Sequence, residues 1–255
     1  MRNGKGRRNI PDGVPMMKRL FWVAVPVLLL ATPTLAETPV APAPVKAERT
    51  FEYLDRADFE PIRLLPAPPA RGSVLEKIEL DRIHALIANA TPERLAQAKW
   101  DAQHENAGIF NEATGRDLAR LPQTWALLDL VRREASVAAS FSKSYFGRYR
   151  PYGVDQTLHD CEGKPNPDPM HGYPSGHSVL GYATGFILAR LIPDRAPAIL
   201  ARAADYALSR EYCGSHFSSD TAASHVIGTL VAEHLLADPR LATRIAAARA
   251  ELLKP

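Results

Sequence analysis

The sequence predicts an all-α protein, because several features of the pattern indicate helices and none indicates a sheet. Apolar residues recur at spacings of three and four, which places them on one face of a helix. Helix-start signals precede several of these runs, and no alternation of polar and apolar residues is long enough for a strand. With 255 residues, 46% of them hydrophobic and 23% charged, the chain is long enough for one domain with a sizeable core.

The predicted helices begin after a proline-rich stretch, residues 64–73, which we expect to be ordered and extended. The next residues carry an apolar stripe of helical spacing, made of Leu75, Ile78, Ile83, Leu86 and Ile87. Thr91 and Pro92 then supply an N-cap and a proline at the first helical position. A second helix is therefore predicted from this point through Trp100.

The second half of the chain predicts more helices. Another apolar stripe consists of Leu127, Leu128, Val131, Ala135, Ala138 and Ala139. Further helices are expected over residues 177–191, 197–208, 218–236 and 239–252. There is no internal repeat and no linker to a second domain, so residues 50–255 are expected to form a single helical domain.

The first 36 residues have the pattern of a secretory signal peptide. Lys18 and Arg19 precede an apolar run over residues 20–31, and Thr34-Leu35-Ala36 offers small residues for cleavage. The apolar run is shorter than the roughly 20 residues that cross a bilayer as a helix. We therefore expect export, cleavage and no stable membrane insertion afterwards, which would make the protein periplasmic or secreted.

Two details of this leader follow from the sequence. Met1, Met16 or Met17 can serve as the start, and residues 37–49 form an Ala/Pro-rich tether without apolar periodicity. The chain has 31 basic and 28 acidic residues, of which six and one lie in residues 1–36; 25 and 27 remain, a charge near −2. The basic character thus belongs to the leader, and nothing beyond it indicates nucleic-acid binding.

The two cysteines, Cys161 and Cys213, are expected to form a disulfide, because export to an oxidising compartment makes pairing the default. Two buried free thiols are the alternative. Cys213 stands three residues before His216, so a bridge would brace the loop that carries this histidine.

Three stretches, residues 143–151, 174–177 and 209–220, concentrate polar groups that a helical core does not need. Lys143, Arg150 and Arg210 supply three cations, enough to neutralise a phosphate dianion, and arginine adds forked donors that match phosphate oxygens. Singly, each would be an ordinary surface residue. Together they predict a site for an oxyanion.

The stretch Pro174-Ser175-Gly176-His177 stands directly before an apolar helical run. Glycine permits close backbone approach, and free N–H groups at a helix start favour an anion. The alternative is an ordinary turn and N-cap. Ser175 and Gly176 are therefore candidate phosphate-binding residues.

The histidines suggest two different chemical roles. His216 and Asp220 are four residues apart, so on a helix they share a face, and the carboxylate can fix the imidazole tautomer and leave the other nitrogen free to attack. The Gly214-Ser215 pair leaves open that His216 stands at a helix start instead. His177 can then act as general acid toward a leaving alkoxide.

The chain carries three motifs in a fixed order: K-x6-R-P, P-S-G-H and S-R-x5-H-x3-D. This order resembles the signature of the type 2 phosphatidic acid phosphatase superfamily, which includes the vanadium haloperoxidases. LLPAPPARGS, YPSGHS and SREYCGSHFSSD are most similar to the class A bacterial non-specific acid phosphatases, over most of residues 50–252. The resemblance implies a helical bundle and chemistry without a metal or other cofactor. It also implies a set of roles, with His216 as nucleophile, Asp220 orienting it, His177 as acid, and Lys143, Arg150, Arg210, Ser175 and the Gly176 N–H binding phosphoryl oxygens.

The sequence therefore predicts an exported acid phosphatase that hydrolyses a broad range of phosphate monoesters through a phosphohistidine. Four alternatives stay open: a lipid-phosphate phosphatase, a pyrophosphate phosphatase, a vanadate-dependent haloperoxidase and a non-catalytic phosphate-binding protein. Homo-oligomerisation and the natural substrate also stay open. One departure from the family's pattern is His171-Gly172 in place of the usual Gly-Ser before Y-P-S-G-H, so that His171 either adds a titrating group to the pocket or faces solvent.

Overall fold

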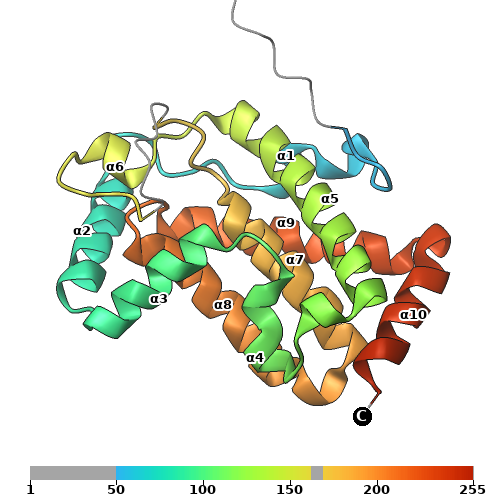
Figure 1. The fold of residues 1–255 in the computed structure, drawn as a ribbon. Helices are drawn as coiled ribbons and strands as arrows, with labels where there is room; N and C mark the ends of the chain where they lie inside the picture. The colour runs from blue at the N-terminus through green and yellow to red at the C-terminus, as the bar shows by residue number, and fades with distance from the viewer. Residues whose placement is uncertain (1–49, 162–168, 255) are drawn as a thin grey trace, which may run out of the picture. The chain divides into compact units, whose positions relative to one another are not determined.

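The computed structural model describes residues 50–161 and 169–254, so the predicted signal peptide (1–36) and tether (37–49) lie outside the described residues. Within these ranges all regular structure is helical, which confirms the all-α prediction (Figure 1). The longer helices are α2 (Val74–Ala88), α3 (Pro92–Gln103), α5 (Pro122–Phe146), α7 (Gly176–Leu191), α8 (Ala196–Tyr212), α9 (Ser218–Ala237) and α10 (Ala242–Leu252). Short turns of helix, α1 (Pro61–Leu64), α4 (Asn111–Thr114) and α6 (Pro151–Val154), connect them.

Helix α7 forms the centre of the bundle and packs against α5, α8 and α9 (Figure 1). Its approach to α9 depends on a small residue. A Cβ atom at Gly228 would lie 2.8 Å from the carbonyl oxygen of Val179, so α9 can pass this close to α7 only with glycine there. Within the described residues, no helix is both long and apolar enough to cross a membrane.

The apolar stripe predicted for α5 is the buried face of that helix, since all six of its residues lie in the core. The stripe predicted for α2 is only partly buried: Ile83 is in the core, but Leu75 and Ile78 are 62% and 58% exposed. Only part of the stripe is buried, because the packed face of α2 is the one on which Ile83, with Leu80 and Ile87, meets Leu158 and Phe217. Glu79 accepts hydrogen bonds from the start of α9.

Polar side chains hold the segments that precede the helices. The buried carboxylate of Glu134 on α5 accepts the backbone N–H groups of residues 52, 53 and 54 at 2.8, 3.3 and 3.0 Å. Thr91 caps α3 as expected, with its hydroxyl oxygen accepting from Arg94 N at 3.2 Å. Tyr173 donates its hydroxyl to the carbonyl of Pro66 at 2.9 Å, which ties the ordered proline-rich stretch to the loop before α7.

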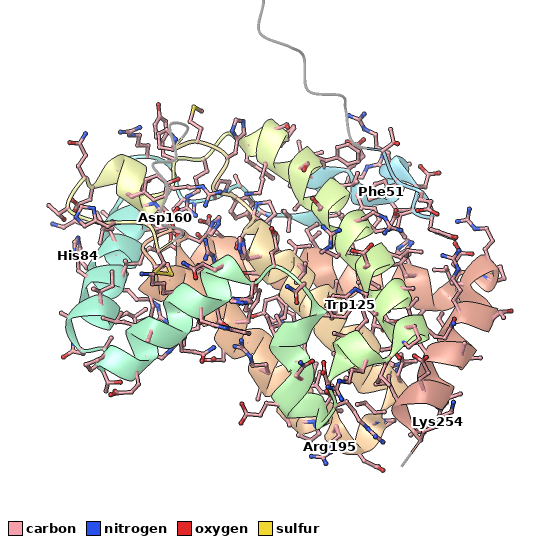
Figure 2. The ribbon with its side chains drawn as sticks, viewed as in Figure 1. Phe51, His84, Trp125, Asp160, Arg195 and Lys254 are labelled. Carbon is pink, nitrogen blue, oxygen red and sulfur yellow. A yellow bond between two sulfur atoms is a disulfide. The ribbon has the colours of Figure 1, made fainter. Side chains whose placement is uncertain are left out.

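Cys161 and Cys213 are joined in a disulfide, visible as a yellow sulfur–sulfur bond in Figure 2. Next to this bridge, Ser215 donates its hydroxyl to Asp160 at 2.7 Å. Two cross-links, one covalent and one polar, therefore fix the loop between α8 and α9. This loop carries His216.

Candidate active site

The predicted site residues come from four places in the fold. Lys143 lies in the last turn of α5 and Arg150 in the extended segment after it, Ser175 to His177 begin α7, Arg210 lies in the last turn of α8, and His216 and Asp220 flank the start of α9. Contacts bring these places together. Lys143 Cε would lie 3.8 Å from a Cβ at Gly176, and Ser175 N donates to Asp220 O at 3.4 Å.

His216 precedes helix α9 instead of lying on its face. Phe217 is the N-cap and Asp220 the third helical residue, so the alternative that places His216 at a helix start is the right one. The Asp220 carboxylate accepts the Phe217 N–H at 2.8 Å and lies 3.3 Å from His216 Nδ1 through the same oxygen, Oδ2. One carboxylate thus caps the helix and orients the histidine.

The contacts of His216 determine its tautomer. Arg150 Nη1 lies 3.1 Å from Nε2, and because a guanidinium only donates, Nε2 must be the acceptor. Nδ1 therefore carries the proton and donates it to Asp220. Burial, followed by the charge of Arg150, lowers the pKa of His216 well below its ordinary value, so the ring is neutral and Nε2 keeps its lone pair.

All three predicted cations influence His216, and Arg150 contacts its Nε2. The charges of Arg150, Lys143 and Arg210 all act on His216, and Arg210 is completely buried. Burial and the charge of Arg150 lower the pKa of Lys143 to about 7, and its Nζ donates to the carbonyl oxygen of His171 at 2.8 Å. Concentrated positive charge of this kind fits an anionic ligand.

His177 is held by the end of α3. Its Nε2 lies 3.1 Å from the carbonyl oxygen of Ala102, and its Nδ1 lies 3.8 Å from a carboxylate oxygen of Glu105. A carbonyl only accepts, so Nε2 is protonated and Nδ1 is the nitrogen that gains or loses a proton. Burial and the charge of Arg210 lower the pKa of His177 well below its ordinary value.

The structure also gives the positions of two further residues singled out in the sequence, Ser175 and His171. Ser175 is the N-cap of α7, and its Oγ accepts from Ser178 N at 3.3 Å and from Ser178 Oγ at 3.0 Å. His171 is exposed and contacts Lys143 through its backbone carbonyl, with a φ of 65°.

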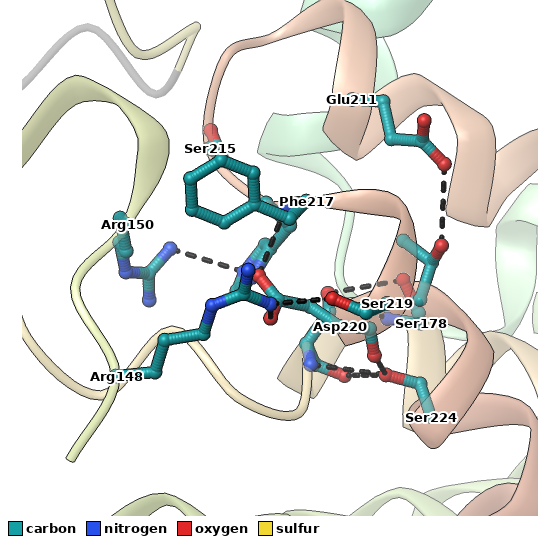
Figure 3. Close-up of polar contacts among 12 residues, drawn as sticks. Arg148, Arg150, Ser178, Glu211, Ser215, Phe217, Ser219, Asp220 and Ser224 are labelled. Atoms are coloured by element: carbon teal, nitrogen blue, oxygen red, sulfur yellow. Dashed lines mark hydrogen bonds and ion pairs between the residues drawn. The ribbon is translucent and has the colours of Figure 1, made fainter. Parts of the chain in front are cut away.

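Sequence reasoning missed two charged residues of the site, Arg148 and Glu79. Figure 3 shows Arg148 beside Asp220, with Arg150 reaching in from the same segment of the chain. Arg148 Nη1 donates to Asp220 Oδ1 at 2.6 Å, and its Nη2 donates to Glu79 at 2.8 Å. Spacing was the available signal, because two arginines separated by one residue in an extended segment point to the same side.

No three His, Cys, Asp or Glu side chains gather as metal ligands would, as far as residues 50–161 and 169–254 are concerned. The expectation of metal-independent chemistry stays a prediction.

Comparisons with known proteins identify the family of the chain. Residues 126–243 match the PAP2 superfamily, that of the type 2 phosphatidic acid phosphatases. The chain is 30% identical to an acid phosphatase from Zymomonas mobilis over 203 residues, 76% of each chain. It belongs to the PAP2 superfamily.

A second PAP2 relative covers more of the sequence. It is a non-specific acid phosphatase from Providencia stuartii, 27% identical over 248 residues, 93% of this chain and 99% of the relative. A transmembrane PAP2-type phosphatidylglycerolphosphate phosphatase from Bacillus subtilis has 17% identity and a TM-score of 0.47, and covers 64% of this chain and 85% of its own. With named acid phosphatases as relatives, the prediction of an enzyme, an acid phosphatase, is confirmed.

Proposed function

We propose that this PAP2 enzyme is an exported phosphatase that hydrolyses small phosphate monoesters through a phosphohistidine on His216. The observation that carries the proposal is the arrangement around the imidazole. Nδ1 donates to Asp220, while the lone pair of Nε2 accepts from Arg150 within a group of three cations. A buried, neutral imidazole held in this tautomer is suited to attack a phosphoryl group.

In the first step the substrate phosphate binds among the three cations, and Arg150 turns its donors from Nε2 to a phosphoryl oxygen. Nε2 attacks phosphorus, a P–N bond forms, and the P–O bond to the alcohol breaks. His177 gives its Nδ1 proton to the departing oxygen, whose unassisted loss would be slow. The cations stabilise the charge on the phosphoryl oxygens throughout.

In the second step water replaces the alcohol. Nδ1 of His177 takes a proton from the water, the resulting oxygen nucleophile attacks phosphorus, and the P–N bond breaks. Inorganic phosphate leaves and His216 returns to its starting tautomer. One nitrogen, Nδ1 of His177, thus serves as acid in the first step and base in the second.

The proton states need an explanation, because the surrounding cations and burial disfavour a charged His177 before substrate binds. A phosphate dianion brings two negative charges into the same pocket and opposes that effect. We therefore expect His177 to take up its proton together with the substrate. An acidic to near-neutral optimum follows, since the substrate-bound acid must be protonated.

The decisive experiment measures phosphate release from p-nitrophenyl phosphate with EDTA present, and compares wild type with His216→Ala. His225→Ala is the matched control, since it removes an exposed histidine from α9. EDTA-resistant turnover that is lost only in His216→Ala is expected. Rapid quenching should also trap acid-labile phosphate on the wild-type protein, and turnover by His216→Ala near the wild-type rate would reject the nucleophile.

Export is part of the proposal and has its own test. The basic residues, short apolar run and small residues that end at Ala36 support it. When the full chain is expressed in a bacterium, the N-terminus of the accumulated protein should begin near Glu37, outside the cytoplasm. A cytoplasmic protein that keeps residues 1–36 would refute export without affecting the chemistry.

A further inference from the structure

The carboxylate that orients the nucleophile has a second partner on its other oxygen. Asp220 Oδ2 faces His216 and the Phe217 N–H, whereas Oδ1 accepts from Arg148 Nη1 at 2.6 Å. Arg148 in turn donates to Glu79 Oε2 at 2.8 Å. These contacts form a chain of four residues, Glu79, Arg148, Asp220 and His216.

We propose that Arg148 and Glu79 are positioning residues, which hold the Asp220 carboxylate so that it keeps the His216 imidazole oriented for attack. The proposal rests on the proposed role of His216 as nucleophile. Arg148 and Glu79 act through Asp220 and do not touch the substrate.

Arg148 is held in a single orientation by its surroundings. Besides Asp220 and Glu79, its Nη1 donates to Ser219 Oγ at 2.6 Å, and its guanidinium lies 4.2 Å from the centroid of the Phe217 ring. Its side chain is only 4% exposed. A planar fork that is stacked on a ring and bonded at both terminal nitrogens fixes the direction of Oδ1, which a lysine ammonium could not do in the same way.

Glu79 links this arrangement to helix α9. Its Oε1 accepts the Ser219 N–H at 2.6 Å and the Ser218 hydroxyl at 2.9 Å, while Oε2 accepts from Arg148. Burial raises the pKa of Glu79, but the hydrogen bonds from Arg148 and Ser219 outweigh it, so the pKa lies below its ordinary value. Glu79 is therefore an anion that fixes both Arg148 and the first turn of α9.

The two residues have opposite electrostatic effects on Asp220. The pKa of Asp220 is raised to about 7, mainly by burial. The charge and hydrogen bond of Arg148 act to lower this pKa, and the charge of Glu79 acts to raise it. Three other titratable groups interact with this carboxylate. His216 is hydrogen-bonded to it, and the charge of the carboxylate acts to raise the pKa values of Lys143 and Tyr173. Removing Arg148 or Glu79 should thus shift the ionisation of Asp220 in opposite directions.

This opposition gives a test that a merely structural role would not satisfy. The pH profile of kcat/KM for p-nitrophenyl phosphate is measured for the full chain and for Arg148→Met, Arg148→Lys and Glu79→Gln. The ionisation of the substrate is the same in all of them, so differences between profiles come from the enzyme. Asp81→Asn is the matched control, because it removes one negative charge from the exposed side of α2.

For Arg148→Met we expect kcat to fall on the order of 10²-fold, with KM changed much less, because the nucleophile is misplaced while the phosphate-binding cations remain. The acidic limb of the pH profile of this variant should move to higher pH by about one unit, because the pKa of Asp220 rises when the positive charge is removed. Arg148→Lys should recover part of both effects. Glu79→Gln should move the acidic limb to lower pH, and Asp81→Asn should leave it in place.

The outcomes separate this proposal from the proposed function. If His216→Ala is inactive but Arg148→Met keeps kcat within about twofold of wild type with an unmoved acidic limb, the positioning role is overturned and the nucleophile stands. If Arg148→Met does not fold, Glu79→Gln decides alone: a shift of the limb to lower pH supports the proposal, and no shift or the opposite shift overturns it.

Discussion

His177 Nε2 lies 3.1 Å from the carbonyl oxygen of Ala102, the last but one residue of α3. This contact leaves Nδ1 as the nitrogen that would exchange the proton in the proposed mechanism. If His177 is the general acid, as we propose, Nδ1 is the atom that acts.

Replacing this acid should have an effect that depends on the leaving group. In His177→Asn we expect hydrolysis of an alkyl phosphate to fall by about 10²-fold or more, because a poor leaving group needs the proton. p-Nitrophenyl phosphate should lose much less, since p-nitrophenolate leaves without protonation. Equal losses for both substrates in steady-state assays would show that His177 does not act as the acid.

Lys143 should set the alkaline limb of activity. With a pKa of about 7, its ammonium loses its proton as the pH rises through neutrality, and the site then has one cation fewer for the phosphate. In Lys143→Arg the cation persists, so the fall of kcat/KM above neutral pH should move to higher pH. Identical alkaline limbs in wild type and variant would assign this limb to another group.

The disulfide should stabilise the fold, and with it the loop that carries His216. Its sequence separation is 52 residues, and closing a loop of this size contributes about 4 kcal/mol in the chain-entropy description. The Cys161→Ser/Cys213→Ser variant should therefore lose most of that free energy of unfolding in urea titrations. Thiol titration of the unfolded, unreduced wild type should find no reactive thiol, and two thiols would contradict the bridge.

Glu134 should stabilise the chain where the described part begins. Glu134→Gln weakens three hydrogen bonds to the backbone of residues 52–54, and we expect a loss of about 2 kcal/mol with unchanged kcat. Glu233→Gln, an exposed position on α9, is the control. Urea denaturation together with limited proteolysis measures both, and a Glu134→Gln variant as stable as the control would refute the anchoring role.

The sequence predicted most of the helices because their ends and faces are local signals. The N-cap at Thr91 and the apolar stripe of α5 depend on residues that are close in the chain, and the structure has both. The same reasoning failed for Leu75 and Ile78 on α2. An apolar stripe predicts burial only where a neighbouring element covers it. Ile83 is covered by Leu158 and Phe217, whereas Leu75 and Ile78, nearer the N-terminus of α2, stay exposed.

The site shows a similar division. The three motifs identified the residues that gather around His216, because each type of residue has its own chemistry. Arg148 and Glu79 were missed because they are 69 residues apart in the chain. Only the tertiary fold, which brings Arg148 against Asp220 and Glu79 against Arg148, indicates a role for them. The position of His216 ahead of α9 was likewise decided by tertiary contacts, which the i,i+4 spacing could not determine.

The supports of both histidines reach outside the segment that the superfamily shares. Residues 126–243 include every residue that we assign to phosphate or to proton transfer, yet Ala102 and Glu79 come from earlier helices. A shortened enzyme made from this segment alone would retain all its reactive groups and lose the carbonyl and the carboxylate that aim them. Engineering a smaller catalyst from this scaffold therefore requires keeping α2 and α3, or building substitutes for two contacts.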